Sequence, residues 1–285
     1  MSKIKIVTGS QASISTQLAE EFNITIIPYY LLKDGNSQRE GVDFDTNDFY
    51  ETLKDINSLP TSSPPSIGDI VSVIDHLSRD HDELVLFTLS AKYSQMYNSC
   101  KLALSQLKSN SLKVHLVDSK GATAYQAMLV IMAARMVKNG WDSSDIITYA
   151  QKFNERADEF IILNTLKYLA KGGRIGKVKA FMGSLLSIKP VIVHRNGEGF
   201  PITRVRTNQQ ALTFIKQQIS QRIKVNKDGK LNILLQGIGV DDWLKKMESE
   251  LSKDFNISNL WFTRISAVTS IHYGPESWSL TYCIE

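Results

Sequence analysis

"ELVLFTLSAKYSQMYNSCKLALSQLKSNSLKVHLVD", residues 83–118, contains the pattern that decides the fold. Residues 83–89 and 113–118 are short runs of mainly apolar, often branched residues, which are typical of buried strands. Residues 96–107 between them have apolar positions at helical spacing. Because a strand, a helix and a second strand in this order favour parallel strands joined by a helix, we predict an α/β domain.

The same alternation extends in both directions. Before this stretch the sequence predicts strands at 4–8 and 25–31 and helices at 15–22, 47–54 and 67–78, and after it a helix at 123–139. A helix at 143–156 leads to a second region, with predicted strands at 160–163, 190–194, 202–206, 231–235, 260–265 and 278–284 and helices at 181–187, 208–222 and 241–251. We therefore predict two α/β domains, residues 1–158 and residues 159–285.

Composition narrows the class of protein. The 285 residues are 42% hydrophobic and 22% charged, which is ordinary for a globular protein, and the net charge of +4 gives little support to nucleic-acid binding. Cys100 and Cys283 have no metal-site spacing and no disulfide framework. The N-terminus has no signal-like segment, and the longest apolar run is too short to span a bilayer. We expect a cytoplasmic protein without a transmembrane segment.

Hydroxyl groups gather in the loops that follow the predicted strands. They occur at residues 8–10, 90–94 and 118–120, and residues 61–63 add three more before a helix. Most hydroxyls beside helices are N-caps, and we expect this role for Ser66 and Thr123. Loops from several parallel strands meet at one edge of the sheet, so hydroxyls and free amides there could surround one anionic group, either a carboxylate or a phosphate.

Hydrolase chemistry has little support. The sequence lacks a G-x-S-x-G elbow and an HExxH pair, and His76, His81, His115 and His194 are expected to be ordinary structural residues. His272 differs, because it lies between a predicted strand and a Gly-Pro turn.

The segment "LKYLAKGGRIGKVKAFMGSLLSIKP", residues 166–190, does not form a nucleotide phosphate loop. Its glycine spacing differs from a Walker sequence, and Val178 rather than a hydroxyl residue follows Lys177. The pattern predicts a helix that ends at Gly172 in a left-handed cap and restarts after Gly176.

Together these motifs resemble the bacterial DegV family of fatty-acid-binding proteins. The resemblance rests on GGRIG at 172–176, VRT at 205–207 and H-x-G-P at 272–275, and on the hydroxyl motifs at 61–66, 89–99 and 117–120. It implies an N-terminal Rossmann-like, mainly parallel sheet, a C-terminal mixed-sheet domain and a long-chain fatty acid bound between them. It also implies a carrier without enzymatic activity or cofactor, which presents the fatty-acid carboxylate to a separate ATP-dependent fatty acid kinase for phospholipid synthesis.

The resemblance assigns roles to individual residues. The carboxylate-binding residues fall on Ser62, Ser94 and His272, with Thr61 and Ser63 beside Ser62. Arg174 and Arg206 fall on positions associated with kinase docking or phosphate transfer.

Candidate residues for the tail pocket follow from the apolar pattern. Met128, Met132 and Met136 share one helical face, and a second group consists of Phe181, Met182, Leu185 and Leu186. A methionine stripe is more often plain core, so we expect at least half of these residues to have that role.

The chain departs from the family pattern near the expected head group, at Gly9, Lys92, Gln95 and Glu276. These changes leave open a second hypothesis, an α/β enzyme or binding protein for a small phosphorylated metabolite, which requires a polar pocket.

Overall fold

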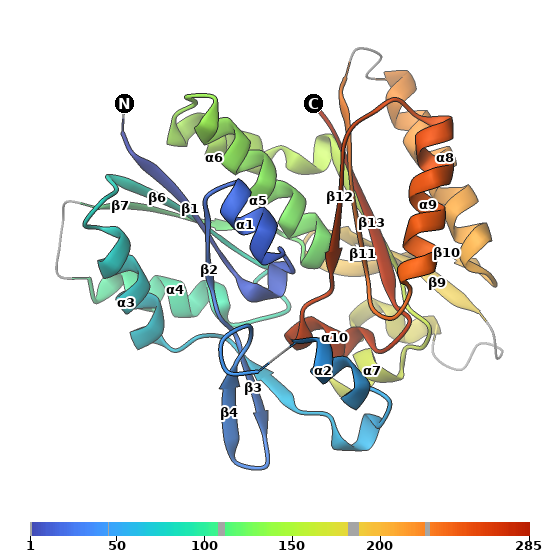
Figure 1. Cartoon of the computed structure of the whole chain (residues 1–285), viewed down its shortest axis with the longest axis horizontal. Coiled ribbons are helices and arrows are strands. Elements are labelled where there is room, and N and C mark those ends of the chain that lie inside the picture. The colour runs from blue at the N-terminus through green and yellow to red at the C-terminus, as the bar shows by residue number, and fades with distance from the viewer. Residues whose placement is uncertain (1, 45, 108–111, 182–187, 226–228) are drawn as a thin grey trace.

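The computed structural model describes residues 2–44, 46–107, 112–181, 188–225 and 229–285. It contains two α/β domains, which confirms the predicted fold class (Figure 1). The predicted helix at 181–187 lies almost wholly outside the described residues. No described helix has the length and apolar character needed to cross a membrane.

The N-terminal domain is built on a four-stranded parallel sheet in the order β2-β1-β6-β7. Its strands are β1 (Ile4–Gly9), β2 (Ile24–Ile27), β6 (Glu83–Thr88) and β7 (Lys113–Asp118). The helices around it are α1 (Thr16–Glu21), α3 (Ile67–Leu77), α4 (Met96–Ser105), α5 (Thr123–Lys138) and α6 (Ser143–Gln151). Leu84 and Leu86 of β6 pack in the core that includes α3 and α4, while Val85 and Phe87 pack in the core that includes α5. This alternation follows from the two-residue period of a strand whose two faces are both covered.

A small antiparallel sheet with the order β4-β3-β5 extends from this domain (Figure 1). It consists of β3 (Tyr30–Lys33), β4 (Asn36–Arg39) and β5 (Thr61–Ser63), and α2 (Thr46–Thr52) lies between β4 and β5 in the chain. The predicted single strand at 25–31 is wrong, because β2 ends before Pro28 and β3 begins at Tyr30. A proline provides no amide hydrogen for a sheet, so the break falls at this position.

The C-terminal domain has a six-stranded mixed sheet in the order β10-β9-β8-β13-β11-β12. Its strands are β8 (Ala157–Ile162), β9 (Lys189–Arg195), β10 (Glu198–Val205), β11 (Leu231–Gly237), β12 (Ile257–Arg264) and β13 (Trp278–Ile284). The long helices α8 (Asn208–Val225) and α9 (Asp241–Asp254) share one core with this sheet. The predicted domain boundary after residue 158 falls inside β8, so we propose that the second domain begins at Ala157.

Helix α5 packs between the two domains. Thirteen of its residues are buried, and its core contains both Phe87 of the first sheet and Leu234 of the second. A helix that is apolar on all sides is suited to such a position.

The predicted end of the helix at Gly172 is confirmed. Gly172 is the C-cap of α7 (Lys167–Lys171), and the left-handed residue of the cap is Gly173, with a φ of 70°. The backbone N–H groups of Gly173 and Arg174 donate to the carbonyls of Ala170 and Leu169, as in a Schellman motif. A 3-10 helix, η4 (Gly176–Phe181), follows.

The predicted cap at Thr123 is wrong. Thr123 is the first residue of α5, and its hydroxyl donates to Glu159 instead of capping the helix. The expected cap at Ser66 is confirmed, because it forms a reciprocal capping box with Asp69.

Candidate functional site

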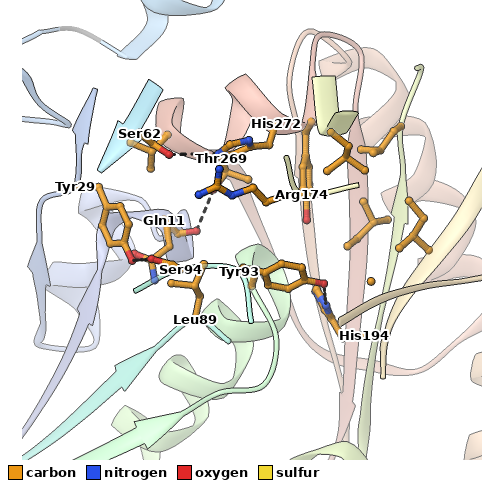
Figure 2. A pocket seen from close by; sticks show the side chains of 18 of the residues that line it. Gln11, Tyr29, Ser62, Leu89, Tyr93, Ser94, Arg174, His194, Thr269 and His272 are labelled. Atoms are coloured by element: carbon orange, nitrogen blue, oxygen red, sulfur yellow. Dashed lines mark hydrogen bonds between the residues drawn. The ribbon is translucent and has the colours of Figure 1, made fainter. Parts of the chain in front are cut away.

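A cavity lies between the two domains (Figure 2). Its volume is about 170 Å³. The loop after β6, the strands β8 and β9, and the short helix α10 (Ala267–Tyr273) all contribute to its wall. The apolar part of the wall is formed by Leu89, Ala122, Ile161, Leu163, Leu169, Val178, Ile192 and Val268.

Polar groups gather on one side of the cavity. Ser62 of β5 is hydrogen-bonded to Nε2 of His272 in α10 at 3.3 Å. Nδ1 of His272 is buried and has no hydrogen-bond partner among the described residues. Arg174, in the turn between α7 and η4, is exposed on one side and also lines the cavity. Figure 2 shows its side chain close to His272 and pointing toward Gln11.

The charge of this site comes from Arg174 rather than from His272. Burial and, second, the nearby Arg174 lower the pKa of His272 to about 4. The imidazole is therefore neutral near pH 7, whereas a guanidinium stays protonated. Together they provide one permanent positive charge and neutral hydrogen-bonding groups.

Ser94 joins the same cavity from the N-terminal domain. Its hydroxyl lies 3.3 Å from the hydroxyl of Tyr29 and accepts a hydrogen bond from the backbone N–H of Met96. Burial raises the pKa of Tyr29 far above its usual value, so Tyr29 remains a neutral hydroxyl. Gln11 lies nearby and donates to Gln126 at 3.1 Å. The polar side is thus formed by side chains from both domains.

The structure explains why glycine occupies position 9. A Cβ atom there would overlap Oε1 of Gln11 and would lie 2.8 Å from Cε2 of Tyr29. These two side chains therefore take the space next to residue 9 that an aspartate would need. Of the other departures, Gln95 lines the cavity, whereas Lys92 pairs with Glu198 at 3.5 Å and Glu276 accepts from Asn164 at 2.9 Å.

The structure brings together four of the predicted site residues: Ser62, Ser94, Arg174 and His272. Thr61 and Ser63 are not among the described residues that line the cavity. Thr61 is exposed, and Ser63 donates to the carbonyl of Pro64. Arg206 is exposed just after β10, and its backbone N–H donates to Gln210.

The described residues among those predicted for the tail pocket lie away from the cavity. Met128 is fully buried in the core around α5, and Met132 and Met136 pack in the same core. The guanidinium of Arg204 lies over the ring of Phe181, 4.4 Å from the centroid of that ring. None of these lines the cavity within the described chain. Met182, Leu185 and Leu186 lie outside the described residues.

The part of the apolar wall that comes from β8 and β9 could not be recognised from the sequence. Ile161 and Ile192 face the cavity, while their neighbours Phe160, Ile162 and Val191 face the core with α8. Both faces of these strands are apolar, so the sequence does not distinguish the cavity side from the core side. The role of His194 was also not recognised from the sequence. This polar residue interrupts the apolar run of β9, and its side chain lines the cavity.

Gly172 allows helix α7 to approach the imidazole of His272. Its φ of −75° suits any residue, but a Cβ atom there would overlap Nδ1 of His272. The absence of a side chain at position 172 therefore helps to place His272 against the cavity.

We expect Gly172→Ala to displace His272 and lower the free energy of unfolding by about 1–3 kcal/mol. Chemical denaturation monitored by fluorescence measures this change. Gly68→Ala is the matched control, because its Cβ would meet Ser66 Oγ at an ordinary 3.7 Å within α3. If the two variants were equally stable, the position of the His272 imidazole would not depend on the absence of a side chain at residue 172.

Two α/β domains and a cavity with one charged, polar side define a two-domain protein with an interdomain binding site. Residues 3–285 match the family model described as DegV family, so the chain belongs to the DegV family.

Relatives of known sequence and structure support this family assignment. A DegV domain-containing protein of Clostridium perfringens is 31% identical over 278 residues and covers 96% of each chain. A stearic-acid-binding protein from Eubacterium ventriosum has a TM-score of 0.87 at 26% identity, covering 99% of this chain and 98% of its own. DegV from Bacillus subtilis, described as a fatty acid binding protein, has a TM-score of 0.86 at 26% identity, with full coverage of both chains.

Proposed function

We propose that this protein binds one long-chain fatty acid, with the carboxylate at Ser62, Ser94, Arg174 and His272 and the alkyl chain in the apolar part of the cavity. The observation that carries this proposal is the combination of a mostly apolar wall with one permanent cation on its polar side. The fatty-acid-binding relatives with the same fold support it.

The two parts of the cavity have different energetic roles. Each CH₂ group transferred from water to the apolar wall contributes roughly 0.8 kcal/mol. The hydrogen-bonding groups contribute less to affinity but fix the orientation, because a buried carboxylate needs partners. A small phosphorylated metabolite would leave the apolar wall of Ile161, Leu163 and Ile192 without a matching group, so this second hypothesis fits the cavity less well.

We also propose that the protein is a cytoplasmic carrier that presents the carboxylate to a separate fatty acid kinase. Arg174 supports this proposal because it borders both the cavity and the solvent. The exposed Arg206 would then act outside the cavity, by attracting the anionic partner or its nucleotide. The polar side of the cavity would be where the carboxylate becomes accessible to the partner.

Calorimetric titration of the delipidated protein with oleate tests the binding function. We expect saturable binding of one oleate, and we expect Ser94→Ala to weaken it about fivefold through the loss of one hydrogen bond. Thr61→Ala is the matched control, because Thr61 is exposed on the neighbouring strand β5. Absence of oleate binding, together with stabilisation by sugar phosphates, would instead support the metabolite hypothesis.

A further inference from the structure

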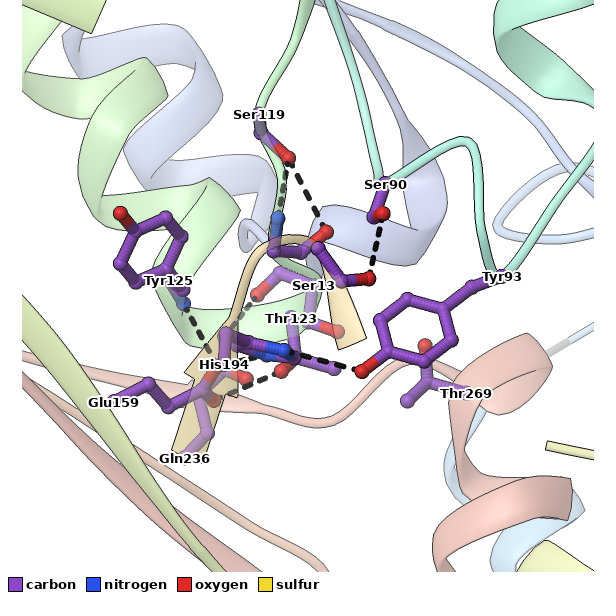
Figure 3. A network of polar contacts seen from close by, with 12 residues as sticks. Ser13, Ser90, Tyr93, Ser119, Thr123, Tyr125, Glu159, His194, Gln236 and Thr269 are labelled. Atoms are coloured by element: carbon purple, nitrogen blue, oxygen red, sulfur yellow. Dashed lines mark hydrogen bonds and ion pairs between the residues drawn. The ribbon is translucent and has the colours of Figure 1, made fainter. Parts of the chain in front are cut away.

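A second polar group borders the cavity, away from the proposed carboxylate site. Its centre is Glu159 of β8, which is 1% exposed. The hydroxyl of Thr123 donates to Oε1 of Glu159 at 2.8 Å, and the backbone N–H of Tyr125 donates to Oε2 at 3.3 Å. Nε2 of His194 lies 3.0 Å from Oε2 (Figure 3). Figure 2 shows His194 and Tyr93 on the side of the cavity away from Ser62.

This network reaches the cavity through two tyrosines. The hydroxyl of Tyr93 lies 3.3 Å from Nδ1 of His194, and the hydroxyl of Tyr273 lies 3.4 Å from Oγ1 of Thr123. Tyr93, Tyr273 and His194 all line the cavity. An alkyl chain offers no partner to these groups, and polar groups that face an apolar ligand lower its affinity. A plain fatty-acid tail therefore leaves this part of the wall unexplained.

The directions of the hydrogen bonds follow from the chemistry of a carboxylate. Because a carboxylate only accepts, Nε2 of His194 carries a hydrogen and donates it to Glu159. In the neutral ring, Nδ1 then accepts the hydroxyl hydrogen of Tyr93. The hydroxyl hydrogen of Thr123 is used on Glu159, so Tyr273 donates to the oxygen of Thr123.

Both tyrosine hydrogens therefore point into the network. The oxygen of Tyr93 also accepts from the backbone N–H of Gly199, so one of its lone pairs and those of Tyr273 remain for the ligand. These remaining lone pairs require a hydrogen-bond donor on the ligand. If His194 is protonated, Nδ1 donates to Tyr93 and the hydroxyl hydrogen of Tyr93 becomes available. A ligand hydroxyl is matched in both states, because it donates and accepts. A ketone or an ester lacks the donor that the first state requires.

Building on the fatty-acid function proposed above, we propose that the cavity is adapted to a hydroxylated long-chain fatty acid, whose hydroxyl group hydrogen-bonds to Tyr93 and Tyr273. The carboxylate is then held on the side of Ser62 and Arg174 and the hydroxyl on the side of His194, with the intervening methylene groups against Ile161, Leu169 and Ile192.

Ricinoleate and oleate form a matched pair of ligands, since they differ only by one chain hydroxyl. Calorimetry on the delipidated protein is expected to show ricinoleate binding about fivefold to tenfold more tightly, as one added hydrogen bond provides. A second pair, ω-hydroxypalmitate and palmitate, tests a hydroxyl at the chain end. The proposal requires that at least one of the two hydroxylated acids bind more tightly than its parent acid.

Tyr93→Phe and Tyr273→Phe are expected to reduce this preference toward unity, because each removes a hydrogen-bond partner of the ligand hydroxyl and so affects the hydroxylated acid more than its parent acid. Tyr149→Phe is the control, because Tyr149 bonds to Cys283 and lies outside the described lining of the cavity. Tight oleate binding with no preference in either pair would overturn this inference alone, and so would a preference that survives both tyrosine variants. Binding of none of the four acids would overturn the fatty-acid function as well.

Discussion

Arg174→Gln is expected to weaken oleate binding by about tenfold to a hundredfold, which corresponds to the loss of hydrogen bonds between ionised groups. The effect is large because His272 is neutral near pH 7, as its pKa is lowered to about 4. Arg174 thus carries the one permanent charge among the described residues that line the cavity. Calorimetry of the variant with oleate measures the change. The solvent-exposed side of Arg174 also predicts that added salt reduces the difference.

Arg206→Gln is the matched control for this experiment. Arg206 is exposed outside the described lining of the cavity, so its removal should leave oleate affinity unchanged. Equal affinities in the wild-type protein and Arg174→Gln would contradict the assigned carboxylate site. A loss in Arg206→Gln comparable to that in Arg174→Gln would show that long-range charge, rather than contact within the cavity, governs binding.

Glu159→Ala is expected to lower the free energy of unfolding by about 3–5 kcal/mol, because a buried donor that loses its acceptor costs about 1–3 kcal/mol and Glu159 is the shared acceptor of three such donors. The substitution leaves Nε2 of His194, the hydroxyl of Thr123 and the N–H of Tyr125 without their buried acceptor. Glu159 belongs to β8 of the second domain, while Thr123 and Tyr125 belong to α5, so the loss also weakens the contact between the domains. Urea denaturation followed by fluorescence measures the change.

Glu51→Ala is the control for this second substitution. Glu51 forms an ion pair with Lys54, and both side chains are mostly exposed. Exposed pairs contribute little to stability, so the denaturation midpoint should barely move. A comparably small shift for Glu159→Ala would mean that water replaces the lost acceptor and that the network is not a structural link between the domains.

The parallel sheet could be predicted because its strands carry a strong local signal. The apolar runs of β1, β6 and β7 are separated by helices with clear periodicity, and Ser66 marks the start of α3 by its capping box. Short elements lack such a signal. The seven-residue helix α10 and the three-residue strand β5, which hold His272 and Ser62, are formed by tertiary packing rather than by a long periodic pattern.

The candidate site could be predicted only where the family motifs name its residues. Ser62, Ser94, Arg174 and His272 come from four distant segments, and no local periodicity brings them together. The role of Thr123 also could not be predicted from the local sequence. A hydroxyl at the start of a helix predicts a cap, but the buried carboxylate of Glu159 is a stronger acceptor partner than solvent, and it takes this hydroxyl. Such a long-range contact has no signature in the surrounding sequence.

The most direct test of the fatty-acid function is native mass spectrometry of the protein purified from a bacterial host, followed by denaturation and identification of the released molecules. We expect a stoichiometric adduct with the mass of one long-chain fatty acid, with hydroxylated acids enriched when they are supplied in the medium. A protein that is isolated without lipid and takes up neither oleate nor ricinoleate would contradict the fatty-acid function.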